Sequence, residues 1–352
     1  MYSHLSCIVI CRILDTFPVM KIMPCNLTCR FLAILLALGL SSSSSGQEQE
    51  TPSCQIRFQA RKGDRMIYEV SVERSTSLPG QVASQSSRLT TTEEWKVTQV
   101  DGSGAIDFLV TYQKVVYEQR SGNEIRYFDS EEHRDQIEKL SNDPHLFSAI
   151  TLLGQHFRVR LASSGVVEKI YDFEDMAQTF AEKLEALGFP GGNPRDQIAQ
   201  GLESETLRNK LSRYTDFSPP KSPIRLGETW TRDYVHYLPP SGRLTEKATF
   251  TLAQLDEKTA VFRSASNPEF SITRSLPGGP KGAQIEMEIR DPKIDSTTRF
   301  DVQRGLLREG QINIRMTFVT TYIFTRYRHR ITREHKKKTG LKLIRYISKQ
   351  DR

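Results

Sequence analysis

Alternation of apolar and polar residues dominates the chain after a polar lead at 47–53. In five stretches an apolar residue returns at every second position, mostly with Glu, Arg, Thr, Asp or Gln between. This period is typical of strands that have one buried and one solvated face, usually in antiparallel sheets. The stretches are Met66–Val72, Ile106–Tyr112, Phe157–Leu161, Ile285–Ile289 and Ile312–Phe318.

The middle of the chain has a helical period instead. From Asp172 onward, apolar residues recur every four positions, which predicts an amphipathic helix that Asp172 can cap. A second helix is predicted from Asn193-Pro194, a cap followed by a first-turn proline. The prolines of SPPKSP at 218–223 end this helical section, because successive prolines cannot continue a helix. The apolar stripe of the first helix consists of Met176, Phe180 and Leu184.

One phrase occurs twice in the sequence. RLTTTEEWKVTQVDGSGA at 88–105 and RLTEKATFTLAQLDEKTA at 243–260 match in apolar positions as well as in several identities. The match contains Asp101-Gly102 in one copy and residues 255–258 in the other, where hairpin turns are expected. Chance similarity is one explanation. The other, which we favour, is one hairpin used in each of two β halves, with Trp95 and Phe250 buried at equivalent positions.

These patterns together predict an α+β fold. The expected architecture is a curved, half-barrel-like antiparallel sheet from two related β halves, with a central helical segment packed on it. We expect a single domain at 47–325, preceded by a signal peptide and upstream extension at 1–46 and followed by a basic C-terminal tail at 326–352. Within the domain the predicted parts are a β half at 55–170, a helical segment at 171–217 and a β half at 223–325.

The positive charge is concentrated in the last residues. The whole chain carries a formal charge of +7, and residues 326–352 contain 11 Lys/Arg and 2 Asp/Glu. Residues 47–325 carry 35 Lys/Arg and 39 Asp/Glu, so the predicted domain is slightly acidic. We therefore expect no specific nucleic-acid binding. The tail interleaves its cations with Tyr, Leu and Ile, and it is either a contact for anionic lipids or polyanions or a solvated extension.

The N-terminus has the three parts of a secretory signal peptide. Phe31–Leu40 is an unbroken apolar run, preceded by Lys21 and Arg30 and followed by SSSSSG. The run is shorter than the roughly 20 apolar residues of a membrane-spanning helix, although an uncleaved anchor is the alternative. We predict cleavage near 41–47 and a secreted or periplasmic bacterial protein. The true start is Met1, Met20 or Met23.

Cysteine and acidic residues predict no cofactor and no metal site. Only Cys54 follows the predicted signal peptide, so neither an intramolecular disulfide nor a structural zinc site is expected. Asp291, Asp295 and Asp301 carry oxygen ligands that suit calcium, but they lack the dense alternating pattern of a calcium loop. The Glu131-Glu132-His133 cluster is interpreted as a polar loop.

Catalytic motifs are also incomplete. SPPK at 218–221, with Ser218 as nucleophile, and KTG at 338–340 are similar to two motifs of penicillin-binding enzymes, but the third motif is absent. There is no G-x-S-x-G, and PGGPKG at 277–282 has the wrong spacing for a phosphate loop. No residue is assigned to catalysis, and the sequence favours a protein without catalytic activity.

Four phrases, in order around the helical segment, carry a family resemblance. They are GDRMIYEV at 63–70, YFDSE at 127–131, LLGQHFRVRLASSGVVEKI at 152–170 and PIRLGETW at 223–230. The chain resembles an uncharacterised family of secreted bacterial β proteins, whose members often carry a Val-Lys-Val-Gly-Asp-Thr-Trp phrase like the last of these. The resemblance covers about residues 55–325. It implies an architecture and a compartment, and no activity.

The function expected from the sequence is therefore that of a non-catalytic, exported envelope protein. One possibility is an apolar ligand, lipid or lipoprotein bound in a cleft between sheet and helices, with Met176, Phe180 and Leu184 as cleft residues. The alternative is a structural or protein-interaction module of the cell envelope. A hydrolase without a recognisable motif is the third possibility. Partners and oligomeric state are not assigned.

Overall fold

The structure is a computed structural model of the whole chain. It describes residues 52–78, 85–141, 143, 146–186, 204–217, 223–238, 242–268, 270–275, 284–324 and 327–351. The predicted signal peptide and the start of the second predicted helix at Asn193-Pro194 lie outside these residues.

The described elements are mainly long strands. The first half contains β1 (Ser53–Cys54), β2 (Arg65–Ser77), β3 (Gln85–Val100), β4 (Ile106–Ser121), β5 (Glu124–Asp129), η1 (Arg134–Gln136), α2 (Ile137–Leu140), α3 (Phe147–Leu152), β6 (His156–Leu161), β7 (Val167–Tyr171), α4 (Phe173–Ala186) and α6 (Ser204–Thr215). The second half contains β8 (Ile224–Arg225), β9 (Thr229–Leu238), β10 (Gly242–Leu255), β11 (Thr259–Ser266), β12 (Phe270–Ser275), β13 (Gln284–Asp301), β14 (Leu306–Ile323), β15 (Arg328–Ile347) and η2 (Lys349–Asp351).

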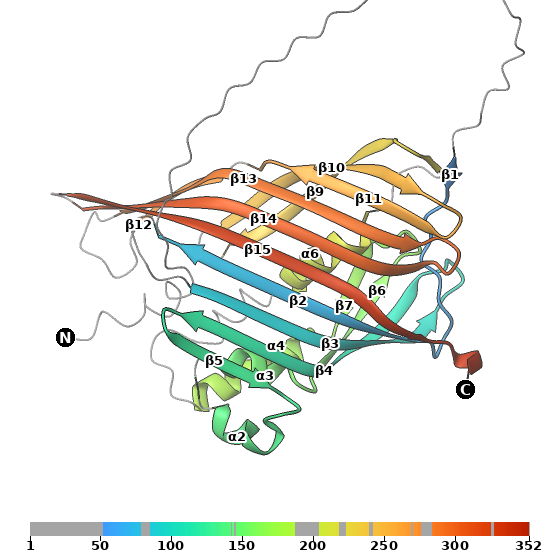
Figure 1. Cartoon of the computed structure of the whole chain (residues 1–352), viewed down its shortest axis with the longest axis horizontal. Coiled ribbons are helices and arrows are strands. Elements are labelled where there is room, and N and C mark those ends of the chain that lie inside the picture. Colours follow the sequence, from blue (N-terminus) through green and yellow to red (C-terminus); the bar gives the residue numbers. More distant parts are fainter. Residues whose placement is uncertain are drawn as a thin grey trace, which may run out of the picture.

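Thirteen strands form one antiparallel sheet in the order β7-β6-β4-β3-β2-β15-β14-β13-β11-β10-β9, with β5 on β4 and β12 on β13. Figure 1 shows this broad twisted sheet, with α4 and α6 behind it and α2 and α3 near β5. The last strand, β15, pairs with β14 on one side and β2 on the other. Residues 326–352 were interpreted as a tail beyond the domain, but most of them form the strand that joins the two halves of the sheet.

The predicted α+β class is wrong, because the protein is mostly β. The helical period from Asp172 does correspond to α4, but the strands are up to 20 residues long and the described helices are short. Residues Arg328–Ile347 of the presumed tail also form a strand, and this strand lies in the middle of the sheet. None of the described helices is long and apolar enough to cross a membrane.

The repeated phrase forms a hairpin in both places. Residues 88–105 span β3, its turn and the approach to β4, and residues 243–260 span β10, its turn and the start of β11. Trp95 and Phe250 are both buried, and each contacts aromatic rings of neighbouring strands. The Trp95 ring lies 5.5 Å from that of Tyr68, and the Phe250 ring lies 5.8 Å from that of Trp230.

The inner face of the sheet is closed by α6. Leu211 and Tyr214 of this helix are buried against the strands, and Arg213 forms an ion pair with the buried Glu246 of β10. Gly310 of β14 lies directly under the Tyr214 ring. A Cβ atom at this glycine would lie 2.9 Å from Cδ1 of Tyr214, closer than packed carbon atoms approach. The packing of α6 against β14 therefore requires a glycine at position 310.

We predict that Gly310→Ala destabilises the protein by about 1–3 kcal/mol, because the added methyl group displaces Tyr214 from a packed interface. The measurement is the free energy of unfolding in urea. Gly102→Ala is the control, since no atom lies within 4 Å of the Cβ position at this exposed turn. Equal stability of Gly310→Ala and the wild type would mean that α6 is not seated on β14.

Candidate functional site: a basic groove on the outer face of the sheet

A groove of about 520 Å³ crosses five neighbouring strands, β14, β15, β2, β3 and β4. Its side chains belong to the face opposite the helices, because they alternate with buried residues such as Val72 of β2 and Thr339 of β15. Side chains directly opposite one another in paired strands project to the same face. The strand register therefore decides which residues meet in the groove.

Two rows of cross-strand neighbours form the groove. The first row runs Arg315, Lys336, Ser75, Ser86, Arg120 from β14 to β4. The second row runs Asn313, Lys338, Glu73, Arg88, Glu118 across the same strands. Five of these ten side chains are cationic and two are anionic, so the groove carries excess positive charge.

The cations at the two ends of the groove differ in their partners. On the β3–β4 side, Arg88 lies 3.3 Å from Glu73 and Arg120 lies 2.6 Å from Glu118. On the β14–β15 side, Lys336 lies 3.2 Å from Glu334. Arg315 and Lys338 form no hydrogen bond or ion pair with any described residue. Their charges are thus available to an anion from solvent.

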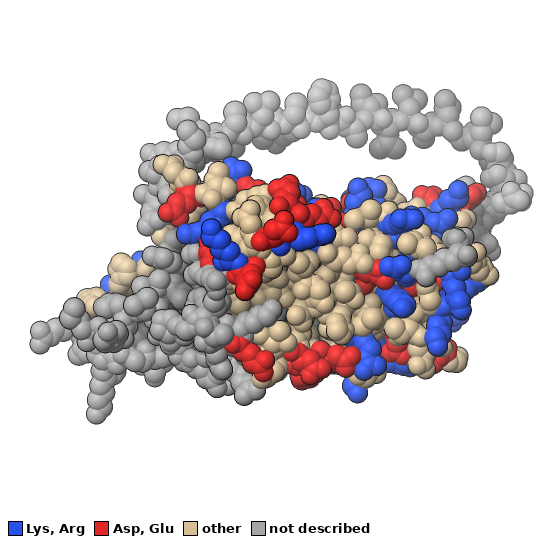
Figure 2. Space-filling view, turned by 90° about the horizontal axis from the view of Figure 1, so that it is seen from below, with Lys and Arg blue, Asp and Glu red and all other residues tan. Residues whose placement is uncertain are grey.

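Figure 2 shows charges of both signs on one face of the molecule. The face seen from below carries Asp and Glu close to Lys and Arg around a central uncharged area (Figure 2). Such interspersed charges partly neutralise one another. Unpaired cations in a groove instead concentrate positive potential, and low-dielectric walls strengthen this effect.

Behind the groove, the inner face of β15 carries His335 and Lys337. Arg74 of β2 is the cross-strand neighbour of Lys337, and Thr76 is the neighbour of His335. Burial, together with the nearby charges of Arg74 and Lys337, lowers the pKa of His335 to about 4. Burial also lowers the pKa of Arg74. His335 is therefore neutral at neutral pH.

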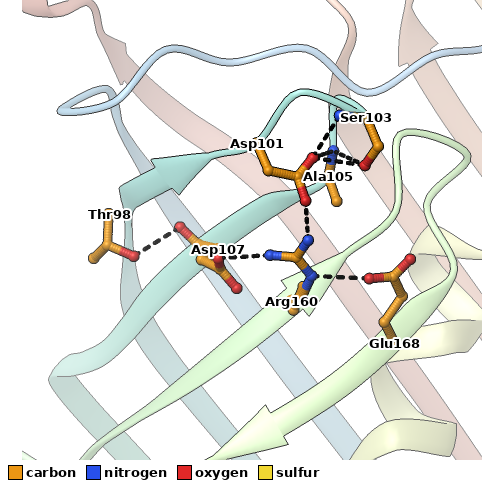
Figure 3. A network of polar contacts seen from close by, with 7 residues as sticks. All are labelled: Thr98, Asp101, Ser103, Ala105, Asp107, Arg160 and Glu168. Atoms are coloured by element: carbon orange, nitrogen blue, oxygen red, sulfur yellow. Dashed lines mark hydrogen bonds and ion pairs between the residues drawn. The ribbon is translucent and has the colours of Figure 1, made fainter.

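A second charged cluster surrounds Arg160 of β6 (Figure 3). Its guanidinium contacts Asp101 at the β3–β4 turn, Asp107 of β4 at 2.9 Å and Glu168 of β7 at 2.9 Å. Hydrogen bonds from Ser103, Arg160 and backbone amides lower the pKa of Asp101 to about 2. Every group drawn in this cluster has a protein partner. It fixes the end of a hairpin and offers no free group to a ligand.

The predicted cleft residues are only partly placed. Met176 of α4 is buried in the main core, 3% exposed, whereas the side chains of Phe180 and Leu184 lie outside the described residues. A void of about 20 Å³ lies between the N-terminal segment at Phe58 and Gln59, the sheet and Thr215 at the end of α6. Such a void holds about one water molecule and no lipid.

The other candidate residues do not assemble into a site. Asp291, Asp295 and Asp301 lie along one strand, β13, which places the first and last about 33 Å apart. Asp295 accepts a hydrogen bond from Asn313, and Asp301 pairs with Arg308 at 2.6 Å. Within the described part of the chain, no group of three His, Cys, Asp or Glu side chains could hold a metal ion.

The catalytic motifs and the single cysteine are likewise separate. Ser218 and PGGPKG lie outside the described residues, and KTG at 338–340 is part of β15. Cys54 is half-buried in β1, and burial raises the pKa of its thiol. Glu131 forms an ion pair with Lys114, and His133 follows it in a turn.

The sequence of this chain matches a family model over residues 103–307, more than half of its length, described as "Family of unknown function (DUF6263)". The protein is a member of the DUF6263 family. The resemblance to an uncharacterised family is thus confirmed at this level. That family members are secreted, and that PIRLGETW is a family motif, stay predictions. Of the ten side chains in the two groove rows of this DUF6263 protein, only Glu118 and Arg120 lie inside the matched region.

Comparisons with other proteins add little about function. A search of curated proteins finds no match. Among solved structures, one of lipovitellin with its lipids is similar at TM-score 0.42 and 9% identity over 82% of this chain, which spans 26% of that chain. OccK5 (OpdH) of Pseudomonas aeruginosa is similar at TM-score 0.21 and 6% identity, over 82% of this chain and 100% of that chain. The β domain of the Bordetella autotransporter BrkA is similar at TM-score 0.17 and 6% identity, over 78% and 98% respectively.

Sequence reasoning missed the groove for a specific reason. Arg315, Lys336 and Ser75 are far apart in sequence and meet only because β15 lies between β14 and β2. The available signal was the concentration of cations at 326–352, which was recognised and assigned to a tail.

The depressed pKa of His335 predicts a pH dependence of stability. The unfolded chain binds a proton near pH 6.5 and the folded protein only near pH 4, so stability falls as pH decreases through this window. We expect His335→Gln, which cannot titrate, to lose less stability than the wild type between pH 7 and pH 4, by up to about 3 kcal/mol. The measurement is urea unfolding at both pH values. Identical losses in the two proteins would contradict a buried, neutral His335.

Proposed function

We propose that this DUF6263 protein is a non-catalytic binding module of the cell envelope that holds an anionic polymer in its outer basic groove. The observation that carries the proposal is the presence of Arg315 and Lys338, two neighbouring cations without a described partner. Arg315 lies directly opposite Lys336, and like charges opposite one another destabilise a sheet. An anionic ligand supplies a counter-charge.

The shape of the groove favours a polymer over a single ion. From β15 to β4 the groove spans three strand spacings, about 14 Å, with cations at both ends. One small anion reaches only one end. An extended chain with repeated negative groups reaches both, and each additional contact at a cation contributes roughly 1 kcal/mol.

Binding of an apolar ligand between helices and sheet, the other function considered from the sequence, is less well supported. Met176, Leu211 and Tyr214 are buried in the main core, and the void beside Thr215 at the end of α6 is about 20 Å³. A lipid would have to displace these side chains. The groove, in contrast, is already open to solvent.

The expected consequence is groove-dependent binding of polyanions. In Arg315→Gln/Lys338→Gln, affinity for dextran sulfate or linear polyphosphate should fall about 30-fold, because two cation contacts are lost. The measurement is the dissociation constant at fixed ionic strength, by fluorescence anisotropy of labelled polymer, together with its salt dependence.

The control is Lys247→Gln/Arg263→Gln. These exposed cations lie on β10 and β11 of the same sheet, so the control removes equal charge away from the groove. Neither variant should unfold at a lower temperature than the wild type. If the two variants lose the same affinity, binding reflects net charge alone and the proposed function is wrong.

A further inference from the structure

The groove is lined by hydroxyl and amide groups between its cations. Ser75 and Ser86 are cross-strand neighbours in its middle, and Asn313 lies at the β14 end. Neither serine hydroxyl forms a hydrogen bond with any described residue. The two serine hydroxyls are therefore free donors and acceptors at the centre of a charged site, whereas the Asn313 amide is bonded to Asp295 and Gln311.

The groove also lacks the groups that two common polyanions require. Peripheral membrane proteins insert apolar side chains beside their cations. The large exposed apolar residues of the described chain lie outside the groove: Val100, Ile125, Tyr127, Leu226, Tyr327 and Ile344. Single-stranded nucleic acids are held by stacking of bases on aromatic rings, and no aromatic residue lines the groove.

We infer that the polymer is an acidic polysaccharide; this inference rests on the proposed function. Its carboxylate or sulfate groups pair with Arg315 and Lys338 at one end. At the other end they contact Arg88 and Arg120, which also form ion pairs with Glu73 and Glu118. Its sugar hydroxyls exchange hydrogen bonds with Ser75 and Ser86 in between. A single sugar ring is shorter than the span of about 14 Å, so the bound segment contains several rings.

The test separates charge from sugar recognition by means of a second variant. Ser75→Ala/Ser86→Ala removes both hydroxyls and leaves every charge in place. We expect it to weaken binding of polygalacturonate and dextran sulfate severalfold, and to leave the affinity for linear polyphosphate unchanged. Neutral dextran should not bind. Arg315→Gln/Lys338→Gln should weaken binding of all three polyanions.

Other results would contradict either the polysaccharide inference alone or the proposed function as well. If the serine variant binds the polysaccharides as well as the wild type does, or if single-stranded DNA binds more tightly through Arg315 and Lys338, the polysaccharide is wrong and the proposed function stands. If phosphatidylglycerol vesicles bind more tightly through these two residues, the ligand is a membrane surface and both proposals are wrong. If no polyanion depends on Arg315 and Lys338, both fall. The thermal unfolding midpoint of each variant is measured as a control, to verify that a variant that loses binding is still folded.

Discussion

The pairing of β15 with both β14 and β2 is the interaction on which the rest of the structure depends. This strand, the last of the chain, lies between strands formed by the two halves of the sequence. Its end is also fixed to the start of β2, where Asp64 accepts hydrogen bonds from the Tyr346 hydroxyl at 2.8 Å and from the Lys349 amide at 3.0 Å. Without it, β2 and β14 would both expose an unpaired edge, which is a template for aggregation.

The interactions that act on β15 differ along its length: some stabilise its pairing and others oppose it. Near its C-terminal end, Leu341 packs in the main core, so burial of apolar surface stabilises the pairing there. Around residues 335–338 it has cations on both faces, with Lys337 beside Arg74 and Lys336 beside Arg315. Repulsion between these pairs opposes pairing. A bound polyanion would relieve the repulsion on the outer face, which couples the proposed ligand to the stability of the sheet.

Local patterns in the sequence predicted local structure well. Alternation located the long strands, the helical period located α4, and the repeated phrase corresponds to two hairpins with buried Trp95 and Phe250. The fold class was wrong because the described helices are short and the protein is mostly strand, including β15 in the presumed tail. At 335–338 both the inner and the outer positions are polar, so alternation is lost there, and the strand pairs with β2 more than 200 residues away. No local pattern encodes such a partner, and the groove depends on it.

Hydrogen exchange of the backbone amides of β15 tests this central position most directly. In a strand paired on both sides, consecutive amides donate to neighbours on alternate sides, so all of them are protected. We expect amides 336–342 to exchange as slowly as those of β2 and β14 when measured residue by residue by NMR. Protection of only every second amide, as in an edge strand, or exchange at the rate of an unstructured peptide would contradict the account.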